Sequence, residues 1–132
     1  NDLMLLQSIG YTPKQGDIVV LRKSSFMSDP VVKRVIATEG QHVTVDYMNH
    51  CVLVDGVPLE EPYILELMQD PNRSDMPVVD VTVPEGSIYV LGDNRNHSSD
   101  SRSERLGTVD TRYVLGRVLC ILLPFDHFGA VE

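Results

Sequence analysis

The residue best placed to do chemistry is a lysine inside a run of valines. Lys33 lies in the segment PVVKRVI. The two-residue alternation of a β-strand puts its side chain on the face of Val31 and Val35, and puts Arg34 on the other face. Desolvation among valines disfavours the charged ammonium, so it lowers the pKa of such a lysine toward neutrality and lets the free amine accept a proton from a nucleophile. The alternative, which Lys33 by itself favours, is a lysine that extends its charged end from an edge strand into solvent.

A second group of polar residues forms the segment GDNRNHSSDSR, which runs from Gly92 to Arg102 and contains no apolar residue. Acids and bases two residues apart surround a group of serine hydroxyls: Asp93 with Arg95 and Asp100 with Arg102, around Ser98, Ser99 and Ser101. Ion pairs and hydroxyl hydrogen bonds within such a segment would hold it in one conformation beside a reacting group. A structured, solvated surface loop accounts for the same composition, and the residue types leave both interpretations open.

The elements that must position these residues are strands. Short, β-branched apolar runs separated by turn glycines indicate an all-β domain. The dipeptide Asp55-Gly56, between CVLV and VPLE, predicts a two-residue hairpin turn. The predicted strands are Asp17–Leu21, Val31–Ile36, His42–Tyr47, Cys51–Val54, Val78–Val83, Ile88–Leu91 and Val118–Leu123, with a strand-like LMLL near the beginning of the chain.

Little of the chain is expected to be helical. Only Glu60–Met68 and a short turn near Asp110–Leu115 are candidates, and neither has two full turns of amphipathic periodicity. The polar segment QDPNRSDMP, from Gln69 to Pro77, predicts an exposed loop because it has a proline near each end.

Composition narrows the class of protein. With 132 residues, of which 42% are hydrophobic, the chain is long enough to bury one core. A net charge of -8 without a basic run gives no electrostatic source of attraction to nucleic acid phosphates, so nucleic acid is not expected as a partner. The histidines have no paired spacing with each other or with cysteine, so the sequence predicts neither a metal nor another cofactor. Cys51 and Cys120 lie far apart inside apolar runs and are expected to be buried free thiols.

Several segments occur together in an order that is typical of one family. They are GDIVV at Gly16–Val20, VKRVI at Val32–Ile36 followed by Gly40, VDGVPLEEPY at Val54–Tyr63, GDNRNHSSDSR at Gly92–Arg102 and GRV at Gly116–Val118. With these segments the chain resembles the bacterial type I signal peptidases over nearly its whole length. The resemblance implies a signal-peptidase-like antiparallel β-sheet domain across residues 1–132, with about residues 42–86 as a smaller inserted β/loop region.

The resemblance also implies roles for individual residues. The family's general base falls on Lys33, and the serine that orients this base falls on Ser98. Residues that support the base and its loop fall, by position only, on Asp100, Arg102, Asp93, Arg95 and Arg34. The activity implied is removal of signal peptides from secreted preproteins by a serine-lysine dyad through an acyl-enzyme.

The substrate of this family is a signal peptide that binds as an added β-strand. The edge strand expected to receive it contains Pro30, Val31 and Val32, because proline is tolerated on a sheet edge and Lys33 would then lie beside the scissile bond. Val32 would line a shallow apolar pocket, with plain core packing as the alternative.

One departure from the family pattern concerns the nucleophile. The family's nucleophilic serine lies in a Ser-Met-X-Pro-Thr motif, and no serine of this chain is followed by methionine. By the family's spacing that serine is expected upstream of Asn1, so the chain as it stands is expected to be inactive. The family also implies an N-terminal transmembrane anchor, a contact with the lipid bilayer and a location on the extracytoplasmic face of the bacterial plasma membrane. The longest apolar run, VLCILLPF at Val118–Phe125, is too short to span a bilayer.

Two other functions remain open at this point. A self-cleaving repressor of the same serine-lysine type would have the same fold and the same base. A noncatalytic β-rich domain that binds peptides would lack the nucleophilic serine in the parent protein as well.

Overall fold

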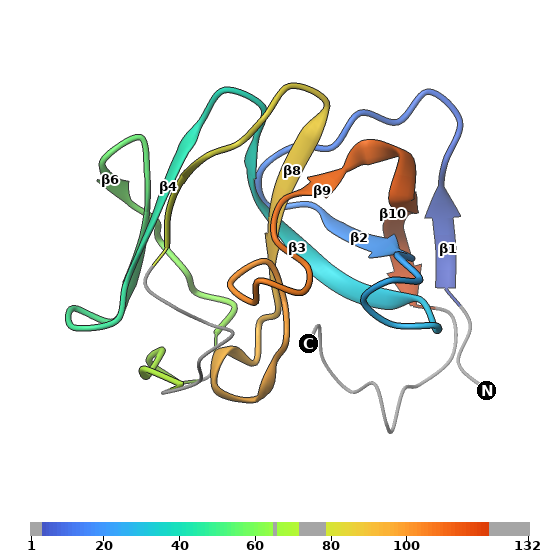
Figure 1. The fold of residues 1–132 in the computed structure, drawn as a ribbon. Coiled ribbons are helices and arrows are strands. Elements are labelled where there is room, and N and C mark those ends of the chain that lie inside the picture. Colours follow the sequence, from blue (N-terminus) through green and yellow to red (C-terminus); the bar gives the residue numbers. More distant parts are fainter. Residues whose placement is uncertain (1–3, 65, 72–78, 122–132) are drawn as a thin grey trace.

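The strands of this protein form two antiparallel sheets (Figure 1). The computed structural model describes residues 4–64, 66–71 and 79–121. Its larger sheet has the strand order β1-β10-β2-β3-β8-β9 and its smaller sheet the order β6-β5-β4-β7. The strands are β1 (Met4–Gln7), β2 (Ile18–Leu21), β3 (Val31–Thr38), β4 (His42–Asp46), β5 (Cys51–Val54), β6 (Val57–Pro58), β7 (Val79–Thr82), β8 (Ser87–Leu91), β9 (Val109–Asp110) and β10 (Val114–Ile121).

Helix is confined, within the described residues, to two short 3-10 turns, η1 (Arg95–His97) and η2 (Thr111–Tyr113). The all-β prediction is therefore confirmed. The helix considered at Glu60–Met68 is wrong for the residues of that stretch that the structure describes, which form no regular element. Pro62 interrupts it, and proline removes a backbone donor that a helix needs.

β3 and β8 lie at the centre of the molecule and separate its two hydrophobic clusters. One face of this pair contributes Ile36, Tyr89 and Leu91 to a cluster that includes the core of the smaller sheet. The other face contributes Val35 and Val90, together with Ile88, to a cluster with Val19 and Leu21 of β2. Because strand side chains alternate between faces, a single pair of strands can bury apolar residues on both sides.

The predicted Asp55-Gly56 hairpin is confirmed. Asp55 and Gly56 both have positive φ angles, 52° and 80°, between the paired residues Val54 and Val57. The carboxylate of Asp55 also accepts a hydrogen bond from the backbone N–H of His42 at 2.8 Å. This turn therefore joins β5 to β6 and at the same time fastens the beginning of β4.

The end of the chain differs from the prediction in its bounds. The last described strand, β10, begins at Val114 rather than Val118, after η2, which matches the short turn expected near Asp110–Leu115. Leu122 and Leu123 of the predicted strand lie outside the described residues, as does most of the loop predicted at Gln69–Pro77. Cys51 is a free thiol but only half-buried, whereas the side chain of Cys120 lies outside the described part.

Candidate active site

Lys33 and Ser98 come together from distant parts of the chain. Lys33 lies in β3 opposite Val19 of β2, and Ser98 directly follows η1. The Nζ atom of Lys33 donates a hydrogen bond to the Oγ atom of Ser98 at 3.1 Å. Lys33 is only 3% exposed, so the alternative of a lysine that extends into solvent is wrong. The amine is held inside the protein, beside a hydroxyl that can orient it.

Asp100 links this serine to Arg102. The Oγ atom of Ser98 donates to Oδ2 of Asp100 at 3.1 Å, and the backbone N–H of Gly92 donates to the same oxygen at 3.0 Å. Arg102 donates to both carboxylate oxygens, from Nε at 2.9 Å and from Nη2 at 3.0 Å. The side chains of Asp100 and Arg102 are both fully buried. The carboxylate of Asp100 thus holds three groups together: the hydroxyl of Ser98, the backbone N–H of Gly92 and the guanidinium of Arg102.

The electrostatics of this cluster follow from its burial. Burial lowers the pKa of Arg102, but the negative charge of Asp100 and the hydrogen bonds to it raise that pKa by more, so the guanidinium stays charged. The pKa of Tyr89 is raised by burial and, further, by the charge of Asp100. Among the buried polar atoms of the described residues, the hydroxyl of Tyr89 and the Nη1 atom of Arg102 make no hydrogen bond.

The predicted acid–base pair between Asp93 and Arg95 does not form. Asp93 instead accepts hydrogen bonds from Nε and Nη2 of Arg34, at 2.8 and 2.7 Å. Arg95 donates from Nη1 to Oε1 of Glu61 at 2.8 Å and from Nε to the carbonyl of Gly92 at 2.7 Å. Between the two residues the backbone enters the turn η1, so each side chain meets a partner from another part of the chain.

Two residues of this network were not predicted as site residues. Glu61 is the partner of Arg95, and the ring of Tyr63 lies under the guanidinium of Arg34, with 4.0 Å between its centre and the Cζ atom. Both belong to the VDGVPLEEPY segment, which carried the family resemblance but no sign of what its side chains contact. Neither the spacing nor the charge pattern of the sequence indicates that Glu61 contacts Arg95 or that Tyr63 contacts Arg34, because the two residues of each pair are far apart in the chain.

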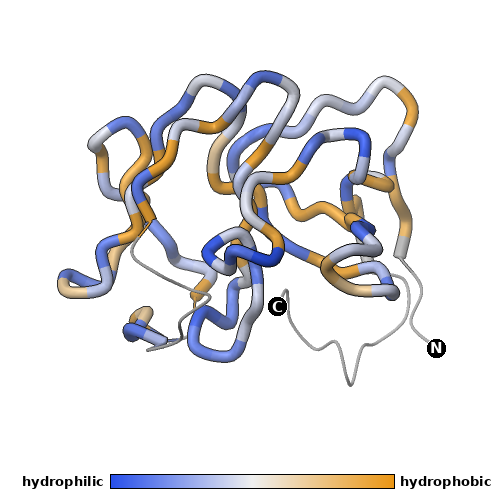
Figure 2. Tube along the Cα trace, in the orientation of Figure 1, coloured by the Kyte–Doolittle hydropathy of each residue, from blue (hydrophilic) through white to orange (hydrophobic). Residues whose placement is uncertain are grey.

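The loop after β8 is also fastened along its backbone. Ser101 donates from its N–H to the carbonyl of Val90 at 3.0 Å, and its Oγ accepts from the N–H of Val90 at 2.9 Å. Figure 2 shows that this loop is largely hydrophilic where it leaves the apolar β8. Its hydrogen bonds and ion pairs account for its order, because it has few apolar side chains to bury.

The residues predicted to receive substrate lie at the start of β3. Val31 and Val32 are half-buried and Pro30 is exposed. β2 pairs with β3 from Val31 onward, whereas the pairing with β8 begins at Arg34 opposite Leu91. Within the described residues, strand pairing of this first part of β3 is therefore with β2 alone.

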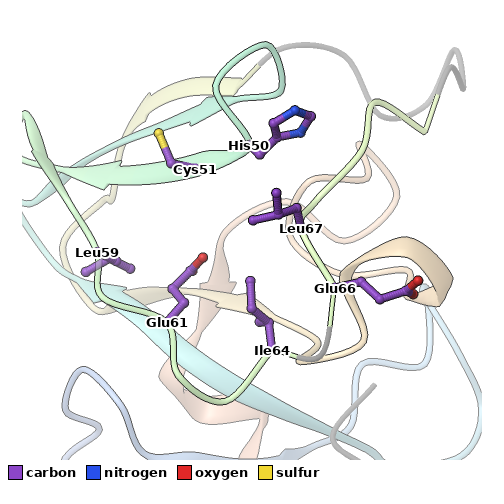
Figure 3. A pocket seen from close by; sticks show the side chains of 7 residues that line it. All are labelled: His50, Cys51, Leu59, Glu61, Ile64, Glu66 and Leu67. Atoms are coloured by element: carbon purple, nitrogen blue, oxygen red, sulfur yellow. The ribbon is translucent and has the colours of Figure 1, made fainter.

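A separate pocket, of about 370 Å³, lies beside the smaller sheet (Figure 3). Its walls contain His50, in the turn before β5, Cys51, the first residue of β5, and Leu59, Glu61, Ile64, Glu66 and Leu67 from the segment after β6. Lys33 and Ser98 do not line it. No set of three or more potential metal ligands is grouped together in residues 4–64, 66–71 and 79–121. At the candidate site itself, Lys33 supplies an amine and Ser98 a hydroxyl, both held by buried side chains.

Comparison with known proteins identifies the family. The family model described as signal peptidase, peptidase S26, matches residues 1–123. The chain belongs to this signal peptidase family. It is 34% identical over 138 residues to a probable signal peptidase I-1 of Synechocystis, a match that covers 97% of the chain and 65% of that relative. It is 40% identical over 119 residues to signal peptidase I of Mycobacterium tuberculosis, a match that covers 77% of the chain and 39% of that relative.

A solved structure in the same family has the same fold. The crystal structure of a signal peptidase I from Enterococcus faecalis superimposes with a TM-score of 0.64 at 31% identity, covering 83% of this chain and 98% of the other. The family resemblance and the signal-peptidase-like fold predicted from the sequence are thus confirmed. The chain spans just under two thirds of the length of the first curated relatives, 65% and 64%. None of the helices in its described part has the length and apolarity needed to cross a membrane.

Proposed function

We propose that this protein is a serine endopeptidase that removes N-terminal signal peptides from secreted preproteins, with Lys33 as its general base. The single observation that carries the proposal is the buried hydrogen bond from the amine of Lys33 to Ser98. Family membership supports the same activity, and the relatives named above are signal peptidases. Their names favour preprotein processing over the self-cleaving repressor.

The nucleophile is proposed to be a serine upstream of Asn1, in the Ser-Met-X-Pro-Thr motif of the family. No serine in the chain is followed by methionine, and the relatives are longer than the region they share with it. The oxyanion-hole donor that the family takes from the same motif would come with it. An oxyanion donor contributes about 10² to 10³ in rate in other hydrolases. Without this motif the chain lacks both the nucleophile and this donor, and we expect it to be inactive.

The proposed reaction uses one amine twice. The neutral Nζ of Lys33 takes the proton of the serine hydroxyl as the serine oxygen bonds to the scissile carbonyl carbon. As the C–N bond breaks, the lysine gives that proton to the leaving amine, and a serine ester remains. Lys33 then takes a proton from water, whose oxygen attacks the ester, and returns it to the serine oxygen. Ser98, held by Asp100, keeps the amine directed at these protons.

The substrate is proposed to bind along the first residues of β3. Val31, Val32 and Lys33 precede the pairing of β3 with β8, and this supports backbone hydrogen bonds to an extended peptide on that edge. Such pairing would place the scissile bond near Lys33. Half-buried Val32 is proposed to line a shallow pocket for a small side chain.

The proposed location is the extracytoplasmic face of the bacterial plasma membrane. This rests on the family alone: an N-terminal transmembrane helix in the complete protein would hold the catalytic domain at the bilayer, where preproteins emerge.

The deciding experiment uses the protein extended upstream to include the Ser-Met-X-Pro-Thr motif. It should cleave a preprotein after its signal peptide, and Lys33→Ala should abolish cleavage, while His97→Ala, at an exposed residue of the same loop, should not. Cleavage by the Lys33→Ala variant at the wild-type rate would refute the assignment of the base. Binding of the preprotein without any cleavage would favour the noncatalytic peptide-binding domain.

A further inference from the structure

Glu61 and Arg95 form a buried ion pair between two segments that are far apart in the sequence. The side chain of Arg95 is fully buried and that of Glu61 is 7% exposed, with 2.8 Å between Nη1 and Oε1. Glu61 follows β6 of the smaller sheet, and Arg95 begins η1 in the loop after β8. Removing one partner of such a pair leaves a buried charge without compensation, which is strongly unfavourable.

Arg95 is in turn connected to the candidate active site by its own backbone and side chain. Its Nε holds the carbonyl of Gly92 at 2.7 Å, and its carbonyl accepts from Nη2 of Arg102 at 2.8 Å. Arg102 binds Asp100, which accepts the hydrogen bond of Ser98. The position of Arg95 therefore constrains both ends of the loop that carries Ser98.

The segment that contains Glu61 is fastened to η1 at a second point. Asn96 donates from Nδ2 to the carbonyl of Leu67 at 3.2 Å and accepts at Oδ1 from the N–H of Gln69 at 2.9 Å. Tyr63 adds a ring contact to Arg34, which is the neighbour of Lys33 in β3. We call residues 59–64 and 66–69 the crossing segment. It contacts both the loop after β8 and the strand that holds the lysine.

We infer that Glu61 is a positioning residue for the Lys33–Ser98 pair and acts through Arg95. Its carboxylate neutralises the buried guanidinium that holds the loop after β8 in place. Figure 3 shows Glu61 in the wall of the pocket, beside Leu59 and Ile64. The catalytic consequence of this inference rests on the proposed function, whereas its structural consequence does not.

The structural consequence can be measured by amide hydrogen exchange on the 132-residue chain, with Glu61→Gln compared to Glu60→Gln. Each variant loses one charge, but Glu60 is exposed. In Glu61→Gln the amides of Gly92, Ser101 and Arg102, which hydrogen-bond within the loop or to β8, should exchange about tenfold faster or more. The amide of Val35, bonded to Asp17, should be unchanged, as should all four in Glu60→Gln. Equal exchange of the loop amides in both variants would overturn the inference.

The catalytic consequence is measured in the protein extended upstream to the nucleophile motif. There Glu61→Gln should lower kcat by about tenfold or more with KM within about twofold, because misplacement of the base affects the reaction more than binding. Glu60→Gln should leave both unchanged. A wild-type kcat in Glu61→Gln overturns the inference, even with faster exchange. If the unmutated extended protein does not cleave, the proposed function fails, and the exchange experiment still decides whether Glu61 holds the loop.

Discussion

Asp100 and Arg102, two residues apart, form a bidentate ion pair in which neither side chain is exposed. The pair lies directly behind Ser98, whose hydroxyl it orients through Oδ2 of Asp100. A carboxylate and a guanidinium buried together stabilise a protein little compared with apolar residues, but each is costly to leave alone. The pair is therefore better explained by the geometry it imposes on Ser98 than by a gain in stability.

Replacement of Asp100 should consequently destabilise the fold more than its size suggests. Asp100→Asn keeps the shape but leaves the Arg102 charge buried without a counterion, which should lower the free energy of unfolding by about 3–5 kcal/mol. Urea denaturation measures this change. The double variant Asp100→Asn with Arg102→Met should recover a large part of the loss. A double variant as unstable as the sum of the two single variants would show that the two charges are not coupled.

Ser98 should be needed for rate rather than for folding. In the protein extended to the nucleophile, Ser98→Ala removes the acceptor for Lys33 and should lower kcat/KM by about 10². Steady-state cleavage of a preprotein substrate measures the effect. Ser98→Thr keeps the hydroxyl and should recover part of the rate. Full activity in Ser98→Ala would mean that the lysine is oriented by other groups.

Arg34 should not be replaceable by lysine. Its guanidinium binds both oxygens of Asp93, the carbonyl of Gly16 and the ring of Tyr63. Its pKa is raised chiefly by the hydrogen bonds to Asp93, so it is charged at any pH of interest. Because an ammonium cannot make these contacts together, Arg34→Lys should lower the free energy of unfolding by about 1–2 kcal/mol.

Arg112 supplies the control for this substitution. It makes a similar pair with Asp110 on the surface, with its side chain 85% exposed. Arg112→Lys should leave the denaturation midpoint unchanged, because solvent screens such pairs. Equal midpoints for the Arg34→Lys and Arg112→Lys variants would argue against a special role for the Arg34 contacts.

Gly116 should be required for the attachment of β1. A Cβ atom at this position would lie 2.9 Å from the carbonyl oxygen of Gln7 and 3.2 Å from Cβ of Leu6. A backbone oxygen cannot move without the strand, so Gly116→Ala should push β1 away from β10 and destabilise the protein by about 1–3 kcal/mol. Thermal unfolding tests this, with Leu115→Ala at an exposed position of the same strand as the control. The prediction fails if the two variants unfold at the same temperature.

Tyr89 should make the protein sensitive to alkali. Burial, and then the charge of Asp100, raise its pKa in the folded state above the value of about 10 in the unfolded chain. Above pH of about 10 the unfolded state therefore loses a proton that the folded state keeps, and the free energy of unfolding falls by up to about 1.4 kcal/mol per pH unit. Tyr89→Phe should remove this part of the slope, whereas Tyr113→Phe, on the surface, should not.

At neutral pH the same Tyr89→Phe substitution should cost little. Its hydroxyl is buried and makes no hydrogen bond within the described residues, so loss of this oxygen should change the free energy of unfolding by less than about 1 kcal/mol. Chemical denaturation at pH 7 and pH 10.5 separates the two effects. A large loss at pH 7 would indicate that the hydroxyl is bonded to an ordered water.

What the sequence alone determined are features set by neighbouring residues. The alternation in PVVKRVI predicted that Lys33 lies on the face of Val31 and Val35. In the structure Lys33 lies opposite Val19, which packs in one hydrophobic cluster with those two valines. Asp55-Gly56 specified its hairpin, because few residues other than glycine, asparagine and aspartate adopt positive φ. The segments shared with signal peptidases identified the family, since their order and composition need no structure to be read.

What only the tertiary structure decided is which charges meet. Asp93 pairs with Arg34 and not with Arg95, and Arg95 pairs with Glu61, although a spacing of two residues favoured the local pair. Whether Lys33 faces solvent or a hydroxyl likewise depended on the loop after β8, which begins far along the chain. A local pattern determines the face on which a side chain lies. The partner on that face is determined by the folding of distant segments against it, and the partner, more than the residue type, makes Lys33 a candidate base.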